Sequence, residues 1–132
     1  MPDPIPSIVL SPRIVAAKAA GKPFVALEST IVTHGMPHPQ NLRTALVVEA
    51  AVRAAGAEPA TIAVVDGVLR IGLEEGELAA LAEASGVLKL SRADLAYAVA
   101  FGRTGSTTVA ATMIAAKAAG IGVFATGGIG GG

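Results

Sequence analysis

The sequence predicts an α/β fold with three layers, in which helices cover both faces of a mainly parallel sheet. Short apolar runs rich in Val and Ile alternate with longer stretches whose apolar residues recur at helical spacing. Most of the helical stretches end at a glycine, as helices commonly do. The dipeptide Asp66-Gly67 separates two apolar runs and predicts a β-hairpin, which adds an antiparallel element. Alternating strands and helices are typical of a parallel α/β architecture.

Five helices are expected from periodicity and capping residues. Ser11, Asn41 and Ser91 are the predicted N-caps, and Ser91 forms a capping box with Asp94. The acidic first turn of the third helix suits the helix dipole. The expected helices cover about residues 12–20, 42–55, 74–84, 92–101 and 107–119.

The apolar runs between these helices predict the strands. They begin near Val25 and cover 61–65, 68–71, 87–90 and 121–125. A glycine-rich turn, 126–132, follows the last of them. Such a turn normally leads into a covering helix or cradles a ligand. We therefore expect the sequence to be cut inside its fold.

The stretch from Val25 to Asn41 is the most informative part of the chain. It places Glu28 in the middle of an apolar run, where a carboxylate must be paired, hydrogen-bonded or protonated. Burial favours the neutral carboxyl group, which can donate a proton. The irregular loop that follows lies where open α/β sheets bind ligands. Glu28 is therefore either a catalytic acid or a structural carboxylate bonded to nearby amides.

Other candidate residues have plainer interpretations. His34 and His38 are four residues apart, which suits a metal pair on a helix, but Pro37 and Pro39 argue against that helix. His34 remains a candidate substrate contact. Asp66 is expected to be a turn residue rather than a catalyst.

The segment 102–108 is expected to be a flexible, hydroxyl-rich loop. With Arg103, its amides and hydroxyls would suit a phosphate, although Gly-Ser-Thr loops are often plain helix caps. Lys89 lies in a short strand just before a helix N-terminus. It either extends from a strand edge into water or binds an anion there.

Composition excludes several classes of function. Ten basic and ten acidic residues give no electrostatic argument for a nucleic acid or an anionic membrane. The absence of cysteine excludes disulfides and thiolate metal sites. The 52% of hydrophobic residues is high for a small domain, which indicates a missing partner surface: an oligomer, a larger fold, or both. The N-terminus does not resemble a signal peptide, so a cytoplasmic location is expected.

The stretch around Glu28 resembles the signature of the pseudouridine-5'-phosphate glycosidases, the indigoidine-synthase-A-like family. Four further stretches agree in order and spacing, and the likeness covers nearly the whole chain. Family members are more than twice as long, so residues 1–132 are expected to be the N-terminal part of one such domain. The agreeing stretches are 61–67, 88–95, 107–113 and 123–131.

The resemblance implies roles for individual residues. Glu28 matches the family's proton donor, while Lys89 and Val109 match substrate-binding positions. Thr108 and Thr126 are expected near the substrate phosphate. The family's metal-binding Asp and nucleophilic Lys would both fall beyond residue 132, so no metal ligand is expected within this chain.

The implied reaction is the reversible cleavage of pseudouridine 5'-phosphate to uracil and ribose 5-phosphate. A lysine would form an imine with the opened ribose, and an acid would protonate the departing carbon of uracil. The resemblance also implies Mn²⁺ and a homotrimer. Without the nucleophile, we expect this chain alone to be nearly inactive.

Two other functions remain open on the sequence. One is a sugar-phosphate kinase or isomerase that uses 102–108 as its phosphate site. The other is a non-catalytic, oligomerising α/β fragment, for which the alanine-rich segment 107–119 and the high apolar content are the reasons.

Overall fold

The structure, a computed structural model, describes residues 8–126. Strands and helices alternate along most of this part of the chain. The strands are β1 (Ile8–Leu10), β2 (Phe24–Leu27), β3 (Glu58–Val65), β4 (Val68–Ile71), β5 (Leu88–Leu90), β6 (Gly105–Thr107) and β7 (Phe124–Ala125). The helices are α1 (Pro12–Ala19), α2 (Gln40–Ala54), α3 (Glu75–Glu83), α4 (Leu95–Ala100) and α5 (Val109–Ala118), with a π-helical turn η1 (Ile31–Gly35) and a 3-10 turn η2 (Arg92–Asp94).

The strands form one sheet built around β3, the longest of them. Its order is β1-β4-β3-β2-β7, and β6 pairs with β3 on the same side as β2 and carries β5. Four of the six pairings between the described strands are parallel, which confirms the expected sheet. The predicted hairpin joins β3 to β4, with positive φ angles of 48° at Asp66 and 80° at Gly67.

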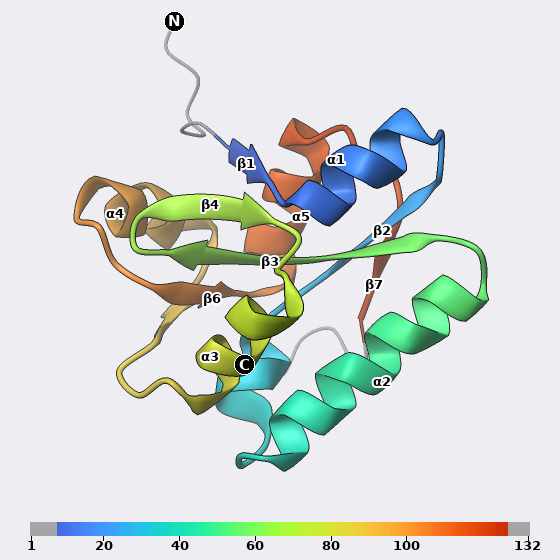
Figure 1. Cartoon of the computed structure of the whole chain (residues 1–132). Helices are drawn as coiled ribbons and strands as arrows, with labels where there is room; N and C mark the ends of the chain where they lie inside the picture. The colour runs from blue at the N-terminus through green and yellow to red at the C-terminus, as the bar shows by residue number, and fades with distance from the viewer. Residues whose placement is uncertain (1–7, 127–132) are drawn as a thin grey trace, which may run out of the picture.

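Helices cover both faces of this sheet, as predicted (Figure 1). Side chains alternate along β3, so Ile62 and Val64 pack in a core with α1, α4 and α5. Ala63 packs on the other face with η1, α2 and α3. Both cores are apolar, while several large hydrophobic side chains, such as Val47 and Phe101, are exposed in the described part of the chain. None of the helices in residues 8–126 is both long and apolar enough to cross a membrane.

The loop expected at 102–108 is confirmed only for 102–104. Residues 105–107 form the buried strand β6, which runs antiparallel to β3 and parallel to β5. The reason is close packing: a Cβ added to Gly105 would lie only 2.5 Å from Leu90 Cγ and Cδ1. Glycine therefore lets β6 lie against the Leu90 side chain, and its hydroxyl residues face inward rather than toward water.

The strand that begins near Val25 is shorter than expected. It ends at Leu27, so Glu28 lies just past the strand and not in its middle. The chain then turns through η1, whose β-branched residues had suggested a longer strand. The last strand is also short, and the glycine-rich turn after Thr126 lies outside the described residues.

Two of the three predicted N-caps are confirmed and one is wrong. Ser11 caps α1, and Ser91 and Asp94 form the expected capping box. Asn41, however, lies inside the first turn of α2 and is buried. Its side-chain amide donates to Val32 O (2.7 Å) and to Ala82 O (2.9 Å). Asn41 thus ties η1 to α3 instead of capping α2.

Candidate functional site

The carboxyl ends of β2 and β7 meet at one edge of the sheet, because the two strands are parallel neighbours. Glu28 follows β2 and Thr126 follows β7. Thr126 Oγ1 donates a hydrogen bond of 2.9 Å to Glu28 Oε1. The carboxyl group is half-buried, so it is neither enclosed in the core nor exposed to open solvent. Such an edge is where open α/β sheets bind their ligands.

A cavity of about 300 Å³ lies beside Glu28. Glu28, Thr44, Thr61 and Thr126 supply its polar groups. A small, mostly apolar cavity with few polar groups suits a small ligand. The apolar lining comes from Leu27, Ile31, Val32, Ala45, Val48 and Ala125.

A buried cluster of hydroxyl groups lies next to Glu28, where β2 and β6 meet end to end along β3. Ser29 Oγ and Thr107 Oγ1 both donate to Ile62 O, at 2.6 and 2.7 Å. Thr107 N donates to Ser29 Oγ (2.8 Å), and Thr112 Oγ1 donates to Thr107 Oγ1 (2.8 Å). This cluster fixes the backbone on either side of the strand ends, and with it the position of Glu28.

The same cluster brings the start of α5 toward the end of β2. Thr30 Oγ1 donates to Thr107 O at 2.9 Å. Thr108 is the N-cap of α5 and accepts a hydrogen bond from Ala111 N, and Val109 is the first residue of the helix. Both predicted residues are therefore within two positions of a group bonded to the β2 end, although neither lines the cavity.

The π-helical turn after β2 presents His34. Its Nδ1 lies 2.6 Å from Thr33 Oγ1, and Thr33 Oγ1 donates to Ser106 Oγ at 2.7 Å. The imidazole is exposed, whereas Ser106 is fully buried. Asn41 anchors this turn through Val32 O, so a residue expected to be a cap instead positions a candidate site residue.

Lys89 lies on β5, directly opposite Ser106 of β6. Residues opposite each other in a ladder project to the same face of a sheet, so Lys89 shares a face with Ser106, the neighbour of His34. The Lys89 side chain is exposed on a strand that pairs, among the described residues, with β6 alone. Lys89 and His34 are not among the residues that line the cavity beside Glu28.

The expected phosphate cradle at 102–108 does not form. The amides of Thr107 and Thr108 are used within the fold, in bonds to Ser29 Oγ and Leu90 O. Arg103 N and O are bonded as well, to Ala98 O and from Gly67 N. These backbone groups are therefore not available to a phosphate, which removes the main reason for a kinase or an isomerase.

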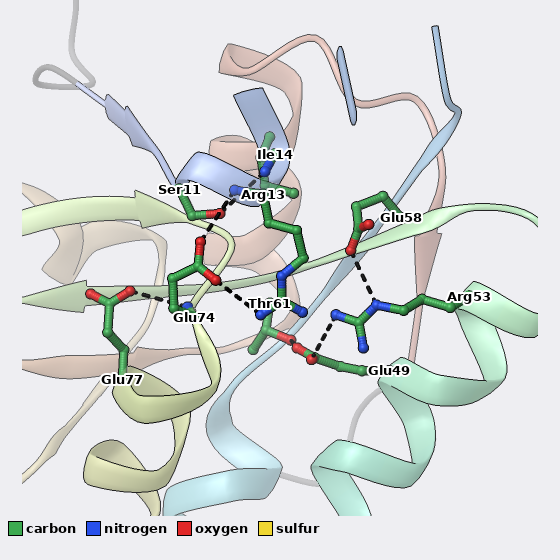
Figure 2. A network of polar contacts seen from close by, with 9 residues as sticks. All are labelled: Ser11, Arg13, Ile14, Glu49, Arg53, Glu58, Thr61, Glu74 and Glu77. Carbon is green, nitrogen blue, oxygen red and sulfur yellow. Dashed lines mark hydrogen bonds and ion pairs between the residues drawn. The ribbon is translucent and has the colours of Figure 1, made fainter. Parts of the chain in front are cut away.

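A second acidic group lies behind the cavity wall and was not identified from sequence. Glu49 of α2 is buried; it accepts a 2.7 Å hydrogen bond from Thr61 Oγ1 and pairs with Arg53 (Figure 2). Arg53 also contacts the buried Glu58. Burial raises the pKa of Glu49, against the hydrogen bond from Thr61, which lowers it. Its apolar neighbours at helical spacing had suggested only a core-facing side of α2.

Within residues 8–126, no group of three or more His, Asp or Glu side chains could hold a metal ion. His34 and His38 accordingly have other partners: His38 Nε2 lies 3.7 Å from a carboxylate oxygen of Glu83. The residues described by the structure therefore do not fit a manganese site.

The chain was compared with known proteins. The family model described as indigoidine synthase A like protein matches residues 13–132. A pseudouridine-5'-phosphate glycosidase of Roseobacter denitrificans is 69% identical over 121 residues, 92% of this chain and 39% of the relative. A protein of the same name from Jannaschia sp. is 67% identical over 124 residues, 94% of this chain and 41% of the relative. The chain thus spans about two fifths of the length of these relatives.

Two solved structures share the fold. The prealnumycin C-glycosynthase AlnA, in complex with ribulose 5-phosphate, has a TM-score of 0.81 and 42% identity, over 98% of this chain and 41% of that one. An indigoidine synthase A-like protein of Thermotoga maritima has a TM-score of 0.80 and 32% identity, over 94% of this chain and 41% of that one.

Proposed function

Because the chain belongs to the indigoidine synthase A-like family, we propose that it forms part of an enzyme that cleaves the C–C glycosidic bond of pseudouridine 5'-phosphate. The reaction consumes one water molecule, gives uracil and ribose 5-phosphate, and is reversible. The observation that carries this proposal is a half-buried carboxyl group at the edge of a small apolar cavity. The relatives that bear the name of this activity, and the neighbour with a bound sugar phosphate, support it.

Glu28 is the proton donor in this proposal. The bond between base and sugar is a C–C bond, so the departing carbon of uracil needs a proton. A carboxyl group beside an apolar cavity can hold that proton and deliver it to a flat ring lying against Leu27 and Val32. Thr126, which donates to Oε1, leaves the second carboxyl oxygen to carry the proton.

The sugar phosphate is bound by groups around this cavity. Lys89 supplies a positive charge for the phosphate, and Thr108 and Thr126 supply hydroxyl groups. Val109 contacts the substrate at the first turn of α5, and His34 contacts it from η1. Of these five residues only Thr126 lines the cavity, so the sugar phosphate would extend beyond the cavity toward the other four.

Other parts of the reaction need groups that residues 8–126 do not provide. The imine-forming lysine and the ligands of any manganese ion would come from the three fifths of the relatives' length that this chain does not span. No step through a metal is assigned to the residues described. A trimeric assembly and a cytoplasmic location also belong to this proposal.

A hybrid enzyme tests the proposal. This chain would replace the matching segment of the Roseobacter denitrificans relative, and uracil release from pseudouridine 5'-phosphate would be measured for the hybrid and for the chain alone. We expect turnover by the hybrid and negligible turnover by the chain alone. A folded hybrid without activity would refute the proposed function. Robust uracil release by the chain alone would refute the proposal that the nucleophilic lysine lies outside this chain.

A further inference from the structure

The exposed His34 ring is the end of a chain of hydrogen bonds that begins in the sheet. Its members come from η1, β6 and β5, which are far apart in the sequence. From the ring inward they are His34 Nδ1, Thr33 Oγ1, Ser106 Oγ and Leu88 O.

The last acceptor, Leu88 O, determines which group donates in each of these hydrogen bonds, because a backbone carbonyl can only accept. Ser106 Oγ donates to Leu88 O at 3.4 Å. Thr33 Oγ1 donates to Ser106 Oγ at 2.7 Å, and its longer contact, 3.5 Å to Thr30 O, is also one in which it donates. Either way, the one hydroxyl hydrogen of Thr33 is directed away from His34.

The 2.6 Å contact between Thr33 Oγ1 and His34 Nδ1 then needs a hydrogen from the ring. Ser106 Oγ, 3.4 Å from the same nitrogen, can accept from it as well. With Thr33 donating to Ser106, the neutral tautomer that satisfies the contact at Nδ1 is the one with its hydrogen on Nδ1 and a lone pair on Nε2. Since Ser106 is fully buried, this preference is built into the fold and not set by solvent.

We propose that Thr33 and Ser106 are positioning residues that hold His34 as the Nδ1–H tautomer, so that Nε2 accepts a hydrogen bond from a sugar hydroxyl of the substrate. Lys89 lies opposite Ser106 on the same face of the sheet. The identity of the ligand as a ribose phosphate rests on the proposed function. The tautomer does not.

Nuclear magnetic resonance measures the tautomer directly. The ¹⁵N-labelled chain would be studied in alkaline buffer, where imidazole rings are neutral, with His38 as an internal reference in the same spectrum. We expect the ¹⁵N shifts of His34 to show a protonated Nδ1 and an unprotonated Nε2. The reverse pattern in the unmodified chain would overturn the proposal.

Variants test the positioning roles. Thr33→Val keeps the shape of the side chain and removes the hydroxyl group, and Ser106→Ala removes the next hydroxyl. We expect each to shift His34 toward the Nε2–H form, whereas Ser91→Ala, in a capping box of its own, should leave the spectrum of His34 unchanged. An unchanged His34 spectrum in a folded Thr33→Val protein would overturn the role of Thr33.

Ribose 5-phosphate tests the ligand. In the hybrid enzyme, His34→Asn should weaken binding about fivefold to tenfold, the effect of one lost hydrogen bond, because it keeps a donor near Nδ1 but has no acceptor near Nε2. His34→Gln has an oxygen close to Nε2 and should recover part of that loss. Equal binding by all three proteins would overturn this inference alone. No binding to the unmodified hybrid would refute the proposed function and, with it, the ligand.

Discussion

Glu28 and Glu49 lie on opposite sides of one cavity wall, and their surroundings suit them to different roles. Glu28 lines the cavity, is half-buried, and accepts a hydrogen bond from a neutral hydroxyl, that of Thr126. Glu49 lies behind the wall, is 3% exposed, and is bonded to Thr61 and Arg53. Thr61 belongs to both settings, since it lines the cavity and donates to Glu49.

The difference teaches that burial alone does not mark a catalytic acid. A carboxylate enclosed by a cation and a hydroxyl group has its lone pairs occupied and no room for a reacting atom. Glu49 therefore stabilises the contact between α2 and β3 (Figure 2). Glu28 has fewer partners and an adjacent cavity, which are the conditions for proton transfer to a ligand.

The largest expected effect separates the two residues by function. In the hybrid enzyme, Glu28→Gln should lower the rate of uracil release by about 100-fold or more, because an amide cannot supply the proton. The free energy of unfolding should change by less than about 0.5 kcal/mol. Glu75→Gln, at an exposed position in α3, serves as the control and should leave the rate unchanged. A Glu28→Gln enzyme with normal turnover would end the assignment.

The next effect separates them by stability. Glu49→Ala should lower the free energy of unfolding by about 2–3 kcal/mol, since it leaves the buried hydroxyl of Thr61 without its acceptor and removes one partner of Arg53. Urea denaturation of the chain measures this loss. Glu83→Ala, which removes an exposed glutamate, should stay within about 0.5 kcal/mol. Similar losses for both variants would mean that Glu49 does not anchor α2.

Several elements of the fold and one residue of the site could be predicted from the sequence. The hairpin at Asp66-Gly67 and the caps at Ser11 and Ser91 were predicted correctly, because each depends on residues a few positions apart. The three-layer fold followed from the alternation of strand and helix patterns. Glu28 was identified through its place in an apolar run before a loop, and the structure does bring it to a cavity.

Two of the errors involve partners that are distant in sequence. Nothing near Gly105 indicates that it must lie against Leu90, so β6 was taken for a loop. Asn41 was wrongly assigned as a cap, because the sequence does not reveal its hydrogen bond to Ala82 O, 41 positions away. The hydrogen bond between Thr33 and Ser106 joins residues 73 positions apart. Local chemistry therefore predicts the elements, while the polar contacts that arrange the site depend on the tertiary fold.

A third prediction uses pH to compare Glu49 with a neutral side chain. Burial raises the pKa of Glu49 in the folded chain above the unfolded value of about 4.3. The folded state then binds this proton more tightly, so the favourable contribution is complete below that value and is lost as the pH rises through the folded pKa. Relative to Glu49→Gln, the unmodified chain should lose stability as the pH rises from about 4 toward neutral. Urea denaturation at several pH values measures the trend, and a difference that grows in the opposite direction would contradict it.

The smallest expected effect has the opposite sign and comes from the first turn of α1. The hydrogen bond from Arg13 lowers the pKa of Glu74, whose side chain is 37% exposed (Figure 2). A lowered pKa contributes stability that is present above the unfolded value and is lost as the pH falls through the folded pKa. Glu74→Gln should therefore lower the free energy of unfolding by less than about 1 kcal/mol at neutral pH, because water screens an ion pair at the surface. This loss should disappear in acid, where Glu74 is protonated. If both glutamates gave the same pH trend, the distinction between an enclosed carboxylate and a paired surface carboxylate would not hold for this fold.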